Sequence, residues 1–317
     1  MGRLGREGRE LTSMNANKTL IFLLAASLSF AQQATFSVET KLVRLIVSVK
    51  NSKGEVVGSL ERGDFKVFDL GVPQQIQYFE HHTELPLSVS ILVDTSGSTG
   101  KELGYEVESV RKFLRALLRE GNPQDAAALY SFNDEVTLLS SFTRREERLN
   151  AALARISATG GTSVYDAVYL AAREIENRDG RHVMIVVSDG GDTTSSGKFE
   201  LARRTAQYSE AIIYPILVVP ITNDAGRNVG GENALKQMAR DTGGRVFEPS
   251  GARQLDQAFT EILRDLRTQY LIGYRPSNLP SDAPAFHTLR VEVSGRDLRV
   301  STRSGYYGDN GARKSGK

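Results

Sequence analysis

Three short segments of the sequence combine carboxylate or hydroxyl side chains with glycine. They read Asp94-Thr-Ser-Gly-Ser98, Thr159-Gly-Gly-Thr-Ser163 and Ser188-Asp-Gly-Gly-Asp192. Hydroxyl and carboxylate oxygens are the ligands that hard dications such as Mg²⁺, Ca²⁺ or Mn²⁺ prefer. Two carboxylates held close together without a cation repel each other, which raises the pKa of one of them, and a dication removes that penalty. The three segments therefore predict a divalent-cation site.

Such a site requires that the segments meet at one edge of a sheet. Residues 87–93 and 183–187 are nearly continuous apolar runs, as expected of strands buried on both faces, and Asp94 and Asp189 follow them closely. In open α/β sheets, ligands bind beyond the carboxyl ends of the strands, where the strand order reverses. If the strand order is 3-2-1-4-5-6, these two strands are neighbours at that point. Two carboxylates and three hydroxyls would then converge on one crevice.

Expected strands and helices alternate through the middle of the chain. Apolar residues recur there either at helical spacing or in short continuous runs. The expected helices include 107–118, 149–156, 165–177, 234–242 and 252–267, and the further expected strands are 126–132, 136–139, 212–219 and 245–248. This alternation predicts an α/β fold with a doubly wound, mostly parallel six-stranded sheet flanked by helices.

Both ends of the chain are rich in expected strands. The patterns are found at 43–50, 65–68, 76–80, 270–274, 288–293 and 298–302. Each end is too small to form a good core alone, and the termini of a domain often lie close together. We therefore expect residues 32–84 and 268–308 to fold together as a small β-sandwich-like domain. The α/β domain of residues 85–267 would be inserted in it, and residues 309–317 would form a flexible tail.

The polar positions of the three segments resemble the metal-ion-dependent adhesion site of von Willebrand factor A domains. The five matching positions are Asp94, Ser96, Ser98, Thr162 and Asp189. The resemblance covers about residues 85–267, with all five positions present in order. The flanking strands resemble a bacterial group of proteins related to this family, known mainly from acidobacteria. The resemblance implies a Rossmann-like domain that binds a divalent cation and a protein partner.

The resemblance also implies a role for each position. Ser96 and Ser98 would bind the metal directly, and Thr162 would bind it directly or through water. Asp94 and Asp189 would act largely through waters. A Glu or Asp side chain of a partner protein would complete the coordination of the cation. In some members of the family the last helix of the domain slides when the site is liganded.

Other interpretations of the same residues remain open. A D-x-S-x-S run alone is more often a helix cap than a metal site, so the metal interpretation depends on Thr162 and Asp189. Asn133, Asp134 and Asp192 lie in loops expected on the same face, where ordinary loop chemistry is the simpler explanation. The second segment lacks the lysine of a phosphate-binding loop, which argues against a nucleotide site.

Composition excludes several classes of protein. The chain has 317 residues, of which 40% are hydrophobic and 25% charged, as in a globular protein of about two domains. The absence of cysteine excludes a disulfide scaffold, thiolate zinc sites, iron–sulfur ligation and a cysteine nucleophile. Four histidines argue against a histidine-rich metal centre. The formal net charge of +2 argues against nucleic acid as the main partner.

The sequence favours a binding protein over an enzyme. It lacks a G-x-S-x-G nucleophile elbow, and it assigns no histidine as a base to Ser96 or Ser98. We therefore interpret the chain as a metal-dependent protein-binding module. One alternative is a metal-assisted hydrolase, in which a metal-bound water attacks the substrate. Another is a scaffold in which the metal is purely structural. The sequence does not determine the oligomeric state.

The N-terminus has the pattern of an export signal. Basic residues precede a short apolar run at 20–30, and Ser29 and Ala31 occupy the small-residue positions before an expected cleavage site. The run is shorter than the about 20 apolar residues that a membrane span needs. We therefore expect residues 1–31 to be a signal peptide and the mature protein to be periplasmic or extracellular, with no membrane span.

Overall fold

The computed structural model of the chain describes residues 42–81, 84–218 and 228–308. The expected signal peptide at 1–31 and the expected tail at 309–317 lie outside the described residues. Within the three described ranges, no helix is both long enough and apolar enough to cross a membrane.

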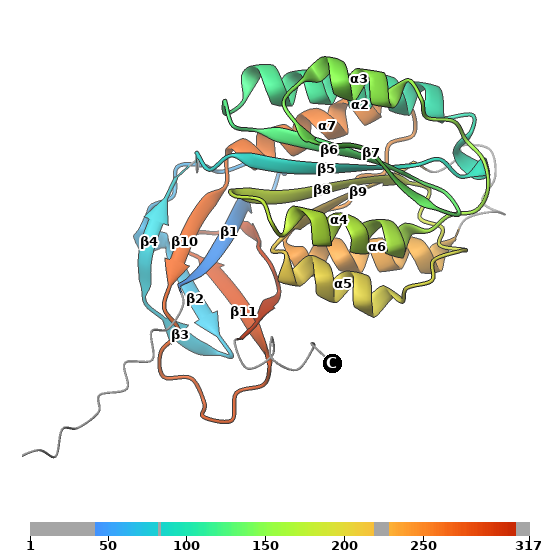
Figure 1. Cartoon of the computed structure of the whole chain (residues 1–317). Helices are drawn as coiled ribbons and strands as arrows, with labels where there is room; N and C mark the ends of the chain where they lie inside the picture. Colours follow the sequence, from blue (N-terminus) through green and yellow to red (C-terminus); the bar gives the residue numbers. More distant parts are fainter. Residues whose placement is uncertain (1–41, 82–83, 219–227, 309–317) are drawn as a thin grey trace, which may run out of the picture. The chain divides into compact units, whose positions relative to one another are not determined.

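A five-stranded sheet with the order β7-β6-β5-β8-β9 forms the centre of the α/β part (Figure 1). Its strands are β5 (Leu87–Asp94), β6 (Ala126–Phe132), β7 (Val136–Thr143), β8 (Arg181–Ser188) and β9 (Ile212–Leu217). β5 is parallel to both β6 and β8, β8 is parallel to β9, and β7 is antiparallel to β6. The strand order therefore reverses between β5 and β8, as the sequence predicted. The predicted α/β fold class is confirmed.

The sheet differs from the predicted six strands at one edge. Residues 245–248 form a single parallel bridge to β9 through Phe247 instead of a strand. Phe247 N donates to Pro215 O at 2.9 Å, and Leu217 N donates to Phe247 O at 2.8 Å. Pairing stops there because Pro249, two residues further on, has no N–H with which to continue the ladder.

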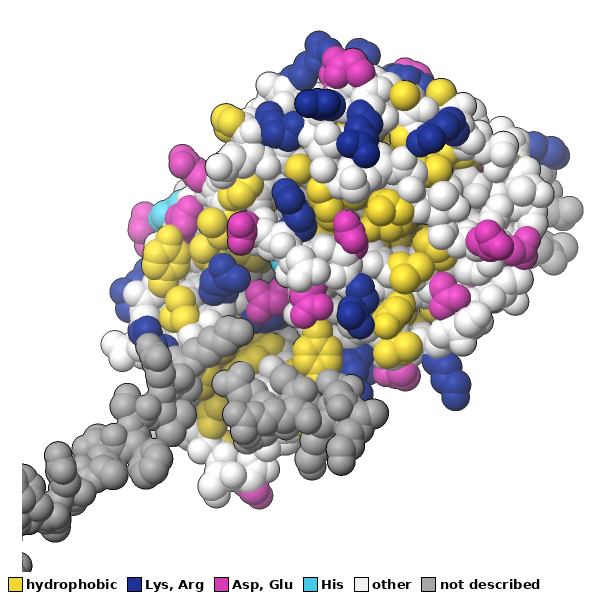
Figure 2. Space-filling model, in the orientation of Figure 1, with side chains coloured by type: hydrophobic (Ala, Val, Ile, Leu, Met, Phe, Trp, Pro, Cys, Tyr) yellow, Lys and Arg dark blue, Asp and Glu magenta, His cyan; other side chains and the backbone are white. Residues whose placement is uncertain are grey.

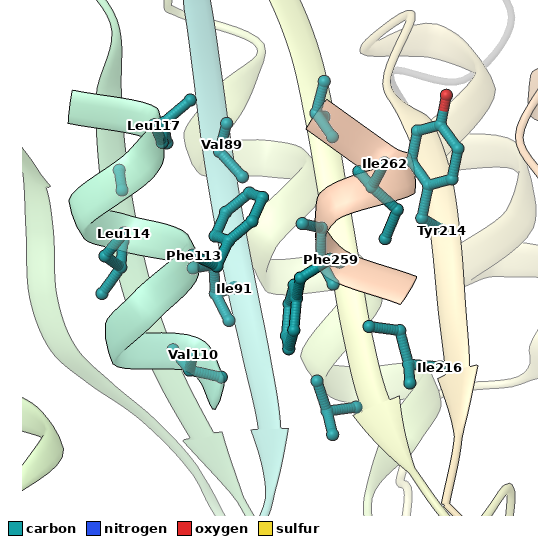
Figure 3. Packing of buried hydrophobic residues seen from close by; sticks show 14 of the residues in the cluster. Val89, Ile91, Val110, Phe113, Leu114, Leu117, Tyr214, Ile216, Phe259 and Ile262 are labelled. Atoms are coloured by element: carbon teal, nitrogen blue, oxygen red, sulfur yellow. The ribbon is translucent and has the colours of Figure 1, made fainter. Parts of the chain in front are cut away.

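Helices cover both faces of this sheet (Figure 1). They are α2 (Leu103–Glu120), α3 (Glu146–Leu153), α4 (Val164–Ile175), α5 (Phe199–Tyr208), α6 (Val229–Thr242) and α7 (Ala252–Arg267). α2, α3 and α7 share one apolar cluster with the sheet, and α4, α5 and α6 share another. Figure 3 shows Phe113 of α2 and Phe259 of α7 beside Val89 and Ile91 of β5, with 5.0 Å between the two ring centroids.

Two helices differ from the sequence prediction. α5 was not predicted, because its buried face has no large apolar side chain from which helical periodicity is recognised. The buried residues of α5 are Ala202, Thr205, Ala206 and Gln207. α6 begins at Val229 and not at the predicted Ala234. Its start is fixed by the side chain of Asn228, which accepts a hydrogen bond from Gly231 N at 2.9 Å.

Strands from both ends of the chain pair into two four-stranded sheets, with the orders β12-β1-β10-β4 and β13-β11-β2-β3 (Figure 1). The strands are β1 (Val43–Lys50), β2 (Phe65–Asp69), β3 (Val72–Gln74), β4 (Ile76–Glu80), β10 (Tyr270–Tyr274), β11 (Phe286–Val293), β12 (Arg299–Ser301) and β13 (Gly305–Tyr307). Each sheet contains strands from before and after the α/β part. One apolar cluster, which includes Leu45, Val67 and Ile272, draws on both sheets. The predicted β-sandwich-like pairing of the two ends is therefore present.

Polar side chains connect the α/β part to these strands. The Arg181 guanidinium donates to Gln269 Oε1 at 3.0 Å, and Gln269 Nε2 donates to Ser48 Oγ of β1 at 3.3 Å. Lys50 Nζ donates to Asp265 Oδ2 of α7 at 2.8 Å. The exact boundaries between the predicted domains remain a prediction.

Basic and acidic side chains are interspersed on the face drawn in Figure 2. This agrees with the near balance of 40 Lys and Arg against 38 Asp and Glu in the sequence. A surface that attracts nucleic acid instead carries a broad field of positive charge. The drawn face therefore presents mixed charge.

Candidate metal centre

Asp94 is the last residue of β5 and is completely buried. Its Oδ1 accepts a hydrogen bond from the backbone N of Ser96 at 2.9 Å, and its Oδ2 accepts one from the Ser188 hydroxyl at 2.6 Å. Ser188 ends β8, and its hydroxyl accepts a further hydrogen bond from Gly190 N at 3.0 Å. Asp94 therefore shapes the first segment and joins the carboxyl ends of β5 and β8.

Ser96 and Ser98 hold their hydroxyls side by side. The two Oγ atoms are 3.0 Å apart, and Ser96 is buried whereas Ser98 is exposed. The backbone here forms the short 3-10 helix η2 (Gly97–Thr99). The Thr99 hydroxyl secures it by donating to the backbone oxygens of Asp94 and Ser96, at 3.2 and 3.0 Å. The turn thus offers two neighbouring neutral oxygens next to a buried carboxylate.

The second segment lies directly against the first. Thr159 N donates to Thr95 O at 2.8 Å, and Gly97 N donates to Gly160 O at 3.1 Å. Gly160 has a φ of 77°, and a Cβ on it would lie 2.0 Å from Asp134 Oδ2. Any other residue would therefore be strained in conformation and blocked by the carboxylate. This close approach brings the start of the second segment onto the first.

Thr162 is buried, and hydrogen bonds to its backbone atoms hold it in place. Thr162 N donates to Thr193 Oγ1 at 2.9 Å, and Thr162 O accepts from Thr193 N at 2.8 Å. Asp134, in the hairpin between β6 and β7, supports the same segment. Its Oδ1 accepts from Gly161 N at 2.9 Å, and its backbone O accepts from the Ser163 hydroxyl at 3.1 Å. Thr193 and Asp134 are therefore positioning residues for the loop that carries Thr162.

Asp189 follows β8 and is partly exposed. Its Oδ1 accepts a hydrogen bond from Gly191 N at 3.1 Å. Its charge lies close enough to Asp94 to raise the pKa of that carboxyl. The first turn of α6 packs directly on this segment, because a Cβ on Gly231 would lie 1.6 Å from Gly190 O. The third segment is thus fixed between β8 and α6.

Two other polar residues of these loops have local structural roles. Asp192 Oδ1 accepts hydrogen bonds from the Ser195 hydroxyl at 2.6 Å and from Tyr165 N, in the first turn of α4, at 3.2 Å. Asn133 Oδ1 accepts from Glu135 N at 3.0 Å inside the β6–β7 hairpin. These contacts agree with the ordinary loop chemistry expected for both residues.

The electrostatics of Asp94 favour a nearby cation. The pKa of Asp94 is raised from its ordinary 3.8 to about 6, and burial is the largest cause. Hydrogen bonds from Ser188 and Ser96 lower the pKa, and the charge of Asp189 raises it. A buried carboxylate with a raised pKa is one whose charge the protein compensates only in part. A dication at this edge of the sheet would supply the missing compensation.

Glu106, in the first turn of α2, was not predicted from the sequence as a site residue. The residue is completely buried, and neither carboxylate oxygen has a hydrogen-bond partner. Burial, and after it the charges of Asp94, Glu102 and Asp189, raise the pKa of Glu106 from 4.5 to about 8. Glu106 lies one turn before the buried Val110, on the apolar stripe of the helix. An acidic residue at an inward-facing position was the signal available in the sequence.

The oxygen atoms present fit a cation held by hydroxyls and balanced by carboxylates. In the part of the chain that the structure describes, no group of three or more His, Cys, Asp or Glu could hold a metal ion. Asp94, Asp189 and Glu106 therefore do not form an all-carboxylate cage. The paired Ser96 and Ser98 hydroxyls beside the buried Asp94 instead match a site for a hard dication with neutral direct ligands.

The structure brings the predicted site residues together to different degrees. Asp94, Ser96 and Ser98 are linked to one another by short polar contacts. Asp189 lies close enough to Asp94 for its negative charge to raise the pKa of Asp94. Thr162 reaches them through backbone contacts between its own segment and the first one. The assignment of all five as metal-site residues remains a prediction.

Comparisons with known proteins support the family resemblance. Residues 89–191 match the model of the von Willebrand factor type A domain. Among curated proteins, the chain is 28% identical over 247 residues to inter alpha-trypsin inhibitor, heavy chain 4 of Mus musculus. It is 25% identical over 251 residues to inter-alpha-trypsin inhibitor heavy chain H4 of Sus scrofa. These matches cover 70% and 71% of the chain but only 25% and 26% of the relatives, so the chain spans about a quarter of their length.

The fold also resembles that of solved structures. A von Willebrand factor type A protein from Catenulispora acidiphila superposes with a TM-score of 0.50 and 12% identity, covering 87% of this chain and 76% of that one. The vWF domain of the type V pili tip protein Mfa5 from Porphyromonas gingivalis gives a TM-score of 0.48 and 17% identity, covering 57% and 95%. At 12% identity, the likeness to the Catenulispora acidiphila protein shows a shared fold alone.

Proposed function

We propose, on the premise that the chain carries a von Willebrand factor type A domain, that it is an exported module that captures an acidic side chain of a partner protein through a bound dication. In this proposal Ser96 and Ser98 bind Mg²⁺, or Ca²⁺ or Mn²⁺ in its place, directly. Thr162 binds it directly or through water, and Asp94 and Asp189 act through waters. The partner protein supplies a Glu or Asp, and the mature protein works in the periplasm or outside the cell.

The pair of serine hydroxyls beside Asp94 carries this proposal. The Oγ atoms of Ser96 and Ser98 are 3.0 Å apart, and Asp94 is completely buried with its pKa raised by burial. Neutral direct ligands leave more positive charge on a dication than carboxylate ligands do. When bound, the cation would offer that charge to an anionic oxygen from outside the chain. An acidic side chain is the simplest protein group with such an oxygen.

Recognition fits the site better than hydrolysis. Among the described residues, no hydrogen bond joins Ser96 or Ser98 to a histidine that would act as a base. In the described part of the chain, Asp94 and Glu106 carry carboxyl groups with raised pKa values near this end of the sheet, and both are completely buried. A buried carboxyl cannot reach a substrate at the surface. A binding role requires neither a base nor a proton path.

A capture experiment tests this function. The full chain is immobilised and incubated with envelope extract, once with Mg²⁺ and once with chelator, and retained proteins are identified. We expect a partner that is retained only with Mg²⁺, and that Asp94→Ala no longer retains. Asp282→Ala is the matched control, because Asp282 is an exposed carboxylate on the loop between β10 and β11.

The acidic residue of the partner is tested next. Once the partner is known, its exposed Glu and Asp residues are replaced by Gln and Asn one at a time. One replacement should abolish retention. Retention that persists in chelator, or that survives every single replacement, contradicts the proposal. Turnover of a phosphoester or peptide panel with Mg²⁺ or Mn²⁺ would favour the hydrolase alternative instead.

A further inference from the structure

We propose that Glu106 is an additional carboxylate of the cation site, which acts on the bound dication from outside its direct ligands and strengthens its binding. This inference deepens the proposed function and rests on it. It assigns a role to a residue that lies outside the five-position motif.

The surroundings of Glu106 supply no partner for its charge. Glu106 is 0% exposed, and neither of its carboxylate oxygens has a hydrogen-bond partner. The charges that act on it most strongly belong to Asp94, Glu102 and Asp189, and all of them are negative. An ionised carboxylate is very unfavourable in such a place unless a positive charge comes near. None of these strongest influences within the described residues is positive, so a bound cation would supply the charge that ionised Glu106 lacks.

The ordinary roles of an acidic residue in a helix do not account for Glu106. An acid in the first turn of a helix stabilises it by accepting hydrogen bonds from free backbone N–H groups or by its exposed charge. Glu106 accepts none and is not exposed. Glu108, two residues further on, shows the usual arrangement, because it is exposed and lies 3.3 Å from Arg111. At the position of Glu106, an aliphatic residue would pack on the same apolar stripe without an electrostatic penalty.

Charge balance explains how Glu106 would act. A dication between Asp94 and Asp189 is formally neutralised by two carboxylates. A third carboxylate, held outside the direct ligands, adds to the electrostatic attraction that holds the cation. Without the cation, the same three groups repel one another and destabilise this end of the sheet. Since no group of three acids in the described residues is arranged as direct ligands, Glu106 acts from a second layer.

Two variants separate this role from a packing role. Glu106→Gln keeps the shape of the side chain and removes its charge, and Glu106→Met also removes the polar atoms. Isothermal titration calorimetry at pH 8 measures the binding of Mg²⁺ and of Mn²⁺. Each variant should bind each cation about tenfold more weakly than the wild type, which is the usual effect of replacing a group that supports the direct ligands. In chelator, Glu106→Met should raise the melting temperature by about 3 °C, because it removes a buried unpaired acid.

The matched control is Glu108→Gln, which removes the same charge from the exposed face of α2 and should change neither quantity. Opposite shifts, with weaker cation binding and a more stable metal-free protein, support the inference. Equal dication affinity in Glu106→Gln and wild type would overturn it, while leaving the proposed function intact. A fall in metal-free stability in both variants would also overturn it, in favour of a packing role. Absence of dication binding by the wild type would overturn both proposals.

Discussion

Two completely buried aspartates, Asp94 in the α/β part and Asp69 in the sandwich, are treated very differently by their surroundings. Asp69 Oδ2 accepts hydrogen bonds from the hydroxyls of Tyr274 and Tyr306, both at 2.8 Å, and Oδ1 lies 3.1 Å from His287 Nδ1. Asp94 accepts from one side-chain hydroxyl and one backbone N–H. Its charge acts on Glu106 more strongly than any other charge does, and the Glu106 carboxylate oxygens have no hydrogen-bond partner.

The difference separates a structural carboxylate from one prepared for a ligand. The sandwich surrounds its aspartate with donors from β10, β11 and β13, so its charge is compensated within the chain. The edge of the parallel sheet gathers Asp94, Asp189 and Glu106 with fewer donors than their charges require. A buried acid that its own chain leaves uncompensated indicates a cation from outside.

The largest expected effect is on the sandwich. Asp69→Ala leaves the hydroxyls of Tyr274 and Tyr306 without their acceptor, so the free energy of unfolding should fall by about 3 kcal/mol. Urea denaturation measures it. The dication affinity should stay unchanged. In chelator, Asp94→Ala should cost clearly less stability than Asp69→Ala, although it removes cation binding. An equal loss of unfolding free energy in the two variants would contradict the proposed difference between the two aspartates.

The next effect is a pH dependence confined to the metal-free protein. Asp94 and Glu106 have pKa values raised to about 6 and about 8 in the fold, from 3.8 and 4.5. Such groups add stability that is fully present below the unfolded values and is lost as pH rises through the folded ones. The melting temperature in chelator should therefore fall by several degrees between about pH 5 and about pH 8.

Saturating Mg²⁺ should remove most of this fall, because the cation favours the ionised carboxylates. Thermal unfolding at four pH values, with chelator and with Mg²⁺, makes the measurement. Glu106→Gln should flatten the upper part of the curve in chelator. A metal-free melting temperature that rises over this range would contradict the assignment of uncompensated acids to this edge of the sheet.

The smallest expected effect concerns the second segment. Gly160→Ala places a Cβ 2.0 Å from Asp134 Oδ2 in a backbone with φ of 77°, so the loop must shift. We expect a loss of about 1 kcal/mol in unfolding free energy and a several-fold weaker dication affinity. Gly104→Ala is the control, since a Cβ there meets nothing within 4 Å and lies in α2. That variant should be neutral or stabilising. An unchanged dication affinity in Gly160→Ala would show that this loop does not contribute to the cation site.

Much of the architecture was predictable because its signals are local. The apolar runs of β5 and β8 and the polar residues that follow them gave the central strands, and the reversal of strand order put the two ends together. Alternation in residues 43–50 gave β1, whose Val43, Leu45 and Val47 are buried as expected. These features depend on a few neighbouring residues, so they can be recognised from the sequence alone.

Other features depend on distant partners and could not be predicted. α5 has alanines on its buried face, and its place is set by the neighbours that pack on it. The bridge at Phe247 replaces a strand because Pro249 ends the pairing. Glu106 has no positive partner among the charges that act on it most strongly, and this is visible only once the fold brings the charges of Asp94 and Asp189 near it. The sequence showed an acid on an apolar stripe, but not what surrounds it.

The interleaving of the two sandwich sheets has a consequence for the order of assembly. β1 pairs with β10 and β12, and β2 pairs with β3 on one side and with β11 on the other, so each of these early strands depends on a strand made after the α/β part. The α/β part between them has apolar clusters built largely from its own residues. During synthesis, it can therefore become compact while the leading strands still expose unpaired edges, which are sites of unwanted intermolecular pairing. A chain that stops after α7 would keep those edges open permanently.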